Sequence, residues 1–375
     1  MNLADVTTPA LALDRAKFER NCARMIEKCR SLGVALRPHM KTLKAIEAAR
    51  VAIDPAHGGI AVSTLREAEY FAAEGIADIQ YAICITPDKL PRAARLMQSA
   101  RQFSFFIDSL DAAEAVAAFA EAGQVPLRPW IEIDSGDHRT GLEPGDDRIL
   151  QIAAMLAGSP AILAGVATHG GHSYGAPDPH GIAAVAEQER LAVVEAAERL
   201  RQAGYEVPGV SAGSTPTAVH MRSAGGLTEV RAGVYMAGDL FQVGIGSHGV
   251  EDIAASVVAT VISHKPERNQ IVVDAGGLAL SKDRATAALA DHDMGYGLVA
   301  DLDGRLAYGR LIVAGVHQEH GEIQGDAPLP FDRLPIGSRV RILPNHVCMT
   351  AAAHERYLVT DGSEVRAEWD KVGGW

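Results

Sequence analysis

The sequence predicts an α/β fold, an eight-stranded parallel (β/α)8 barrel of the TIM type with a C-terminal, mainly antiparallel β domain. A length of 375 residues exceeds one ordinary small domain and suits a barrel with an appended module. Short β-like runs and helical segments alternate eight times from about residue 34. Beyond about residue 246, β-like runs instead follow one another with few helices between them.

The eight predicted barrel strands are short, rich in apolar residues and separated by helical patterns. They comprise residues 34–39, 58–64, 78–84, 103–108, 128–134, 162–170, 207–214 and 228–235. The segments between them, such as 44–54 and 182–204, have the Ala, Glu, Arg and Leu content of amphipathic helices. We therefore expect a barrel domain over residues 14–245.

The C-terminal part carries four alternating or β-branched runs, which predict a β domain over residues 246–375. These runs are 256–264, 269–276, 310–318 and 338–346. The N-terminal residues 1–13 include the apolar run TPALALD. We expect this segment to pair with the β domain before the chain enters the barrel.

The composition excludes several classes of protein. The chain is 47% hydrophobic and 22% charged, and its net charge of -12 comes without a basic cluster for nucleic acid or anionic membranes. No apolar stretch approaches the roughly 20 residues that span a bilayer. The four cysteines show no CxxC spacing, and the N-terminus has no secretory pattern. A cytoplasmic protein with reduced thiols is expected.

Reactive groups of a parallel barrel lie at the carboxyl ends of its strands. The first predicted strand is followed by Lys41, and a lysine there can form an imine because such a site desolvates its amine. A plain surface lysine is the alternative for this residue alone. Other predicted strands end in polar, glycine-rich segments, namely 134–141, 169–175, 213–215 and 231–235. We expect these segments to share one rim with Lys41.

Gly213, Ser214 and Thr215 follow the seventh predicted strand and precede Pro216, which suits the first turn of a helix. Backbone N–H groups and two hydroxyls at such a turn favour a phosphate cradle, at the place where barrels commonly bind phosphate. Ordinary loop chemistry is the alternative for this motif.

His346 and Cys348 form a second constellation in the segment LPNHVC. On a strand, positions two apart point to the same side, so both side chains could face one ion. Imidazole and thiolate suit zinc, and two protein ligands leave the open positions that a catalytic metal needs. A packed core pair is the alternative.

These segments together resemble the fold-type III pyridoxal-phosphate enzymes of the D-serine dehydratase, D-threo-3-hydroxyaspartate dehydratase and D-threonine aldolase group, within the alanine-racemase-like superfamily. The resemblance covers nearly the whole chain. The motifs that carry it are RPHMKTLK (37–44), VSTLREAEYF (62–71), IDSGDHRTG (133–141), THGGHSYG (168–175), GSTPT (213–217), EVRAGVY (229–235), VDAG (273–276), SKDR (281–284), QEHG (318–321) and LPNHVC (343–348).

The resemblance implies that Lys41 forms the imine with pyridoxal 5'-phosphate and that His346 and Cys348 bind a divalent metal, zinc or alternatively manganese or magnesium. It also implies a homodimer and a small D-amino acid substrate. The residues that fall where the family contacts cofactor or substrate are His39, Arg139, Tyr174, Gly213, Ser214, Thr215 and Tyr235.

The expected activity is dehydration of a D-3-hydroxy amino acid, namely D-serine, D-threonine or D-3-hydroxyaspartate, to a 2-oxo acid and ammonia. Cys348 favours this activity. The metal-binding motif of the dehydratases in this group looks like His-x-Cys, whereas that of at least some D-threonine aldolases looks like His-x-Asp. Retro-aldol cleavage to glycine and an aldehyde is the first alternative. An amino-acid racemase and a non-catalytic pyridoxal-phosphate-binding protein are further alternatives.

Overall fold

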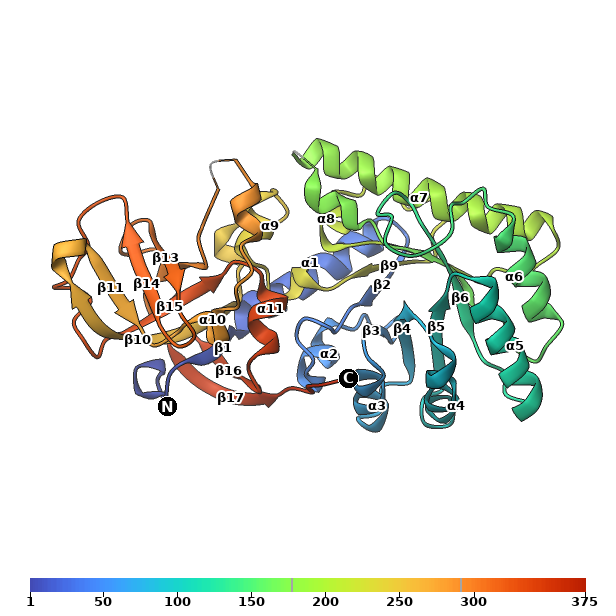
Figure 1. Ribbon diagram of the computed structural model, residues 1–375, viewed down its shortest axis with the longest axis horizontal. Coiled ribbons are helices and arrows are strands. Elements are labelled where there is room, and N and C mark those ends of the chain that lie inside the picture. The colour runs from blue at the N-terminus through green and yellow to red at the C-terminus, as the bar shows by residue number, and fades with distance from the viewer. Residues whose placement is uncertain (177, 291) are drawn as a thin grey trace. The chain divides into compact units, whose positions relative to one another are not determined.

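A computed structural model describes residues 1–176, 178–290 and 292–375 of the chain (Figure 1). The chain forms two compact units. The barrel unit comprises residues 24–233 with 372–375, and the β unit comprises residues 1–23 with 234–371. No helix in the described ranges is long and apolar enough to cross a membrane.

The barrel unit contains an eight-stranded parallel sheet in the order β2-β9-β8-β7-β6-β5-β4-β3. A parallel bridge between His39 and Ala61 joins the two end strands, and the Met40 N–H donates to the Ala61 carbonyl over 2.8 Å. The barrel predicted from the sequence is thereby confirmed. Its strands are β2 (Ala35–Pro38), β3 (Gly59–Val62), β4 (Asp78–Cys84), β5 (Gln102–Ile107), β6 (Pro129–Ile133), β7 (Gly165–Thr168), β8 (Gly209–Ala212) and β9 (Glu229–Ala232).

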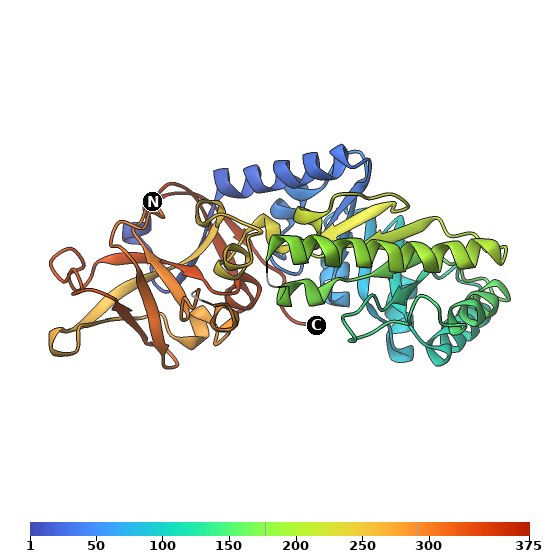
Figure 2. The ribbon, with the colours of Figure 1, turned by 90° about the horizontal axis from the view of Figure 1, so that it is seen from above.

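Helices follow the barrel strands, and several begin at a side chain that caps the first turn. Thr64, Ser109 and Asp178 each accept a backbone N–H three residues onward, which satisfies an otherwise unpaired donor. The long helix α7, green in Figure 2, contacts β7 and β8. The helices are α1 (Arg15–Ser31), which spans the division between the units, and α2 (Ile46–Ala52), α3 (Leu65–Ala73), α4 (Leu90–Ser99), α5 (Leu110–Gly123), α6 (Arg148–Ala157), α7 (Pro179–Gln202) and α8 (Thr215–His220).

Charged side chains join strands across the barrel unit. The Arg37 guanidinium of β2 lies 3.0 Å from the Asp78 carboxylate of β4 and 2.8 Å from the Glu229 carboxylate of β9. Glu229 also accepts the Ser211 hydroxyl of β8 over 2.7 Å. Because buried charges are costly without partners, these contacts hold the strands in one register.

The β unit is built on a closed ring of six antiparallel strands, β10-β11-β14-β13-β12-β15, in which β15 pairs back with β10. Strand β1 extends the ring, since it pairs antiparallel with β10 and parallel with β16. The strands are β1 (Ala10–Asp14), β10 (Ala255–Lys265), β11 (Gln270–Val273), β12 (Gly297–Ala300), β13 (Leu311–Val316), β14 (Gly321–Gly325), β15 (Arg339–Pro344), β16 (Arg356–Asp361) and β17 (Glu364–Asp370). The short helices are α9 (Leu240–Gly244), α10 (Gly277–Leu280) and α11 (Val347–Ala352).

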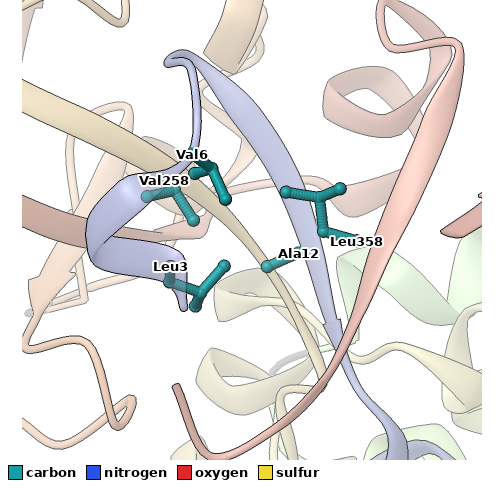
Figure 3. Close-up of a cluster of buried hydrophobic side chains, with 5 residues drawn as sticks. All are labelled: Leu3, Val6, Ala12, Val258 and Leu358. Carbon is teal, nitrogen blue, oxygen red and sulfur yellow. The ribbon is translucent and has the colours of Figure 1, made fainter. Parts of the chain in front are cut away.

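The N-terminal segment packs into the β unit. Leu3, Val6 and Ala12 form a buried cluster with Val258 of β10 and Leu358 of β16 (Figure 3). Burial of these aliphatic side chains, together with the strand pairing of β1, accounts for the return of the first residues to a unit formed mostly by the C-terminal half. The domain limits of 14–245 and 246–375 with 1–13 stay predictions.

Candidate active site

Lys41 lies in the turn that follows β2, at the carboxyl end of the strand as predicted. Its neighbours Met40, Thr42 and Leu43 are buried, whereas the Lys41 side chain is exposed. The turn is therefore anchored by the residues around Lys41, and the amine is directed away from the packed core. Lys44, the other lysine of the motif, instead forms an ion pair over 3.1 Å with a buried carboxylate of α3, that of Glu67.

His39 precedes this turn, and its pKa is affected by burial and by two cations. Burial, followed by the charges of Lys41 and Arg231, holds the pKa of His39 well below its ordinary value. The His39 Nε2 lies 3.5 Å from the Ser63 hydroxyl at the end of β3. A neutral imidazole is therefore present beside Lys41 at neutral pH, and it adds no positive charge to the rim.

His169 follows β7 and is neutral for a similar reason. Burial and the charge of Lys41 lower the pKa of His169 to about 3. Its Nδ1 lies 2.9 Å from the Gly213 carbonyl, which accepts only, so Nδ1 carries the proton. The Nε2 of His169 is then an acceptor. The contact also joins the loop after β7 to the loop after β8.

The turn from Gly213 to Thr215 begins α8, as the sequence predicted, and Ser214 is its N-cap. Gly213 has φ +129°, and an added Cβ would collide with the backbone of Arg231 on β9. Its N–H donates to the Glu189 carboxylate over 2.7 Å, and the Ser214 N–H donates to the Thr217 hydroxyl over 2.8 Å. Two N–H groups expected to cradle a phosphate are thus engaged within the protein.

The hydroxyls at this turn form a small network. The Ser214 Oγ lies 3.1 Å from the Ser173 Oγ of the loop after β7 and 3.0 Å from the Thr217 Oγ1. Thr215 is buried beside them. The Ser214 hydroxyl, which can rotate between partners, fits a phosphate oxygen better than the engaged N–H groups do. The phosphate cradle itself stays a prediction.

Glu189 of α7 is a functional candidate that the sequence did not single out. Its carboxylate is completely buried, and its Oε1 accepts the N–H of Gly170 over 2.5 Å and that of Gly213 over 2.7 Å. Burial raises the pKa of Glu189, although these donors oppose the rise. One side chain thereby fixes two glycine turns of the rim. In sequence it is one of many acidic residues of a helix, and no local signal distinguishes it.

Arg139 and Tyr174 lie on the loops after β6 and β7. The Arg139 guanidinium is 60% exposed and lies 3.7 Å from the Asp137 carboxylate. Its charge contributes to the lowered pKa of His169, after burial and Lys41, so Arg139 faces the same rim. Tyr174 is half-buried in a short helical turn, Gly171–Gly175.

Arg231 of β9 is a buried cation beneath the barrel rim. It is buried, and its guanidinium donates to the Ser211 hydroxyl and, over 2.5 Å, to the Thr168 carbonyl. It also lies over the Phe106 ring at 5.3 Å. Burial lowers the pKa of Arg231, and the carboxylates of Glu229 and Glu189 oppose the change. Arg231 thus joins strands β7, β8 and β9 beneath the rim.

The remaining predicted residues belong to the β unit. Tyr235 lies in a short helical turn, Val234–Met236, where it is buried and its carbonyl accepts His248 Nε2 over 3.0 Å. His346 and Cys348 are not on a strand, which corrects the local structure expected for them. Strand β15 ends at Pro344, His346 is the N-cap of α11, and Cys348 is the second residue of that helix.

The side chains of His346 and Cys348 nevertheless meet, because a cap residue and the first turn of its helix lie on one side of the helix end. A hydrogen bond joins the imidazole to the sulfur. Burial lowers the pKa of His346, but the bond to Cys348 and the carboxylates of Asp239 and Asp283 outweigh it and raise that pKa to about 10. An imidazole nitrogen and a sulfur directed at each other are a donor set that fits zinc.

A different group of possible ligand atoms lies in the barrel unit. Single atoms of Cys84, Asp108 and Glu132, at the ends of β4, β5 and β6, lie within 4.8 Å of one another. The Cys84 thiol donates to the Glu132 carboxylate over 3.0 Å, and burial followed by the Glu132 charge strongly raises the pKa of Cys84. The thiol is therefore protonated in the protein without a metal, and the three side chains form a hydrogen-bonded group.

Known protein families match both units. The alanine racemase N-terminal domain family matches residues 13–240, and the serine dehydratase domain family matches residues 254–360. The chain is 43% identical to D-threo-3-hydroxyaspartate dehydratase of Delftia sp. over 100% of this chain and 99% of the relative. It is 32% identical to D-serine dehydratase of Dictyostelium discoideum over 96% of this chain and 94% of the relative.

A solved structure agrees with these sequence matches. The chain superimposes with a TM-score of 0.96 and 41% identity on a D-threo-3-hydroxyaspartate dehydratase variant, in which one cysteine is replaced by alanine, in its metal-free form. The match covers 100% of both chains. The chain therefore belongs to the alanine-racemase-like group of D-serine and D-threo-3-hydroxyaspartate dehydratases that the sequence motifs indicated.

Proposed function

We propose that the protein is a pyridoxal-phosphate- and divalent-metal-dependent lyase that dehydrates D-3-hydroxy amino acids to 2-oxo acids and ammonia. The observation that carries this proposal is the pairing of an imidazole and a sulfur at the start of α11, in a chain that also places an exposed lysine at a barrel strand end. The relatives named above support it, since both are dehydratases of 3-hydroxy amino acids. D-threo-3-hydroxyaspartate is the first substrate to test.

Lys41 would hold the cofactor and later act as a base. When bound, pyridoxal phosphate supplies an electron sink for the Cα–H bond, and the metal supplies a Lewis acid for the 3-hydroxyl. The Lys41 amine, when it is not bonded to the cofactor, would take the α-proton of the substrate. Burial and the nearby cations lower the pKa of His39, so its neutral ring would add no positive charge beside Lys41.

The other residues bind and orient. Ser214 and Thr215 would contact the cofactor phosphate, with Gly213 shaping the turn, while Arg139, Tyr174 and Tyr235 would contact cofactor or substrate. His346 and Cys348 would hold the metal, with zinc preferred because one ligand is a thiolate and with manganese or magnesium as alternatives. The homodimer and the cytoplasmic location expected from the sequence stay predictions.

Incubation of the cofactor-loaded protein with D-threonine and zinc tests the reaction type. Dehydration gives 2-oxobutanoate and ammonia, whereas retro-aldol cleavage gives glycine and acetaldehyde. We expect the first pair, and we expect a chelator to abolish its formation while the cofactor remains bound, because the metal acts on the substrate hydroxyl. Glycine as the main product would replace the dehydratase proposal with an aldolase, and full activity in metal-free protein would contradict the role of the metal.

A further inference from the structure

The carboxylate of Asp283 contacts the imidazole of His346. Its Oδ2 lies 2.6 Å from the His346 Nδ1. An ionised carboxylate only accepts, so Nδ1 holds a proton in this contact and Nε2 is the nitrogen that is left to bind a metal ion. Neither Asp283 nor its motif SKDR has a role in the function described above.

Asp283 is itself held in place by its loop. Its Oδ1 accepts the N–H of Ala285 over 2.8 Å, and its own N–H donates to the Ser281 hydroxyl over 3.2 Å. Ser281 adopts φ +68°, a backbone conformation that residues other than glycine rarely adopt. The backbone of this loop is therefore strained at Ser281. The loop holds Oδ1 of Asp283 at the Ala285 N–H and Oδ2 at the His346 imidazole.

The segment that carries Asp283 is also joined to α11. The Thr350 hydroxyl of α11 donates to the Leu280 carbonyl over 2.8 Å, and the His354 Nε2 lies 3.0 Å from the Ala279 carbonyl. At the other end of α11, the buried Asp239 accepts the N–H of Val347 over 3.0 Å. The helix start that presents His346 is thus fixed relative to the Asp283 carboxylate.

We propose that Asp283 is a positioning residue that fixes the ring orientation and tautomer of His346, so that Nε2 is the metal-binding atom beside the Cys348 sulfur. A carboxylate on the remote nitrogen of a metal-binding histidine orients the ring and raises its basicity, and loss of such a partner weakens metal binding. The inference rests on the proposed metal site. It adds the residue that prepares this site before an ion arrives.

Zinc affinity of the cofactor-loaded protein without substrate tests this role. A chelating dye that competes for zinc would compare the wild type with Asp283→Ala, Asp283→Asn and Asp293→Ala. Asp293 is the matched control, because its carboxylate lies on the same stretch of chain but pairs with Arg284 over 2.5 Å. We expect Asp283→Ala to weaken zinc binding about 10- to 100-fold and Asp293→Ala to leave it unchanged.

Asp283→Asn should lose less affinity, since its amide oxygen can still accept the Nδ1 proton. Melting temperature with a chelator present separates positioning from folding, because positioning predicts that Asp283→Asn melts like the wild type while binding zinc more weakly. If Asp283→Ala does not fold, the Asn variant alone decides. Wild-type zinc affinity in a folded Asp283 variant would overturn this inference only, whereas a wild type that binds no metal would overturn the proposed metal site as well.

Discussion

The barrel rim and the start of α11 bring reactive groups together by different means. At the rim, residues distant in the chain meet because each follows a separate strand of one closed sheet. His169 and Gly213 are joined by a 2.9 Å contact across two loops, and Glu189 of α7 contacts both loops. Placement at the rim therefore depends on the whole barrel.

At the start of α11, His346 and Cys348 are two residues apart and meet through local backbone geometry. Their setting is nevertheless supplied by remote carboxylates, those of Asp239 and Asp283. A short motif can therefore identify the reacting residues of a site. The carboxylates that orient these residues lie about 60 to 110 residues away in this chain. Variants in each region can separate the two contributions.

The largest effect is expected at the rim, from Lys41→Ala. Its side chain is exposed and packs no core, so the variant should fold, but the visible absorbance band of the lysine-bound cofactor and all turnover should be lost. Lys44→Ala is the matched control in the same motif, because Lys44 is engaged with Glu67. A borohydride-reducible linkage to the cofactor that survives in Lys41→Ala and disappears in Lys44→Ala would show that Lys44, and not Lys41, forms the imine.

A smaller effect is expected from Glu189→Leu, which removes the acceptor shared by Gly170 and Gly213. Each buried N–H left without a partner costs about 1–3 kcal/mol, so the rim loops should shift and cofactor affinity should fall about tenfold or more. Titration of the cofactor-free protein with pyridoxal phosphate measures this. Glu189→Gln keeps an acceptor oxygen and should recover most of the affinity.

Glu187→Leu serves as the control for that variant, since Glu187 lies on the same helix but is 47% exposed and pairs with Arg190. If Glu189→Leu and Glu187→Leu bind the cofactor equally well, the two glycine turns do not depend on the buried carboxylate. The rim would then resemble the α11 site, with local geometry as its main determinant.

Much of the barrel could be predicted from the sequence, because few other folds accommodate eight alternations of strand and helix. The carboxyl ends of the strands in such a barrel lie on one face. Lys41 was proposed from its position after the first strand, and its role stays a prediction. Glu189 was not found, since an acidic residue in an amphipathic helix is indistinguishable from a solvated one. Only the fold shows that this position is buried beneath two loops.

The α11 site was predicted in part. The pairing of His346 with Cys348 was expected from a strand, and the structure instead provides a helix start, where the two side chains also meet. Alternation in SRVRILPNH favoured a strand through His346, but Asn345 and Asp239 end β15 and start the helix by binding neighbouring backbone groups and side chains. Such tertiary contacts override a local pattern and are invisible in it.

The smallest effect, and the sharpest test of the difference between the regions, is expected from Cys348→Asp. A thiolate favours zinc, whereas a carboxylate favours harder ions such as manganese, so the ratio of zinc to manganese affinity should fall. If this ligand also helps to set the reaction, the ratio of glycine to 2-oxobutanoate formed from D-threonine should rise. Cys84→Ser is the matched control, because Cys84 is the other thiol beside carboxylates and its proton is retained. It should leave both ratios unchanged.

Two outcomes would contradict this assignment of the metal site. A Cys348→Ala protein with stoichiometric zinc and normal turnover would mean that Cys348 is a packed thiol. A change in metal preference in Cys84→Ser would indicate that the metal binds at the barrel rim instead.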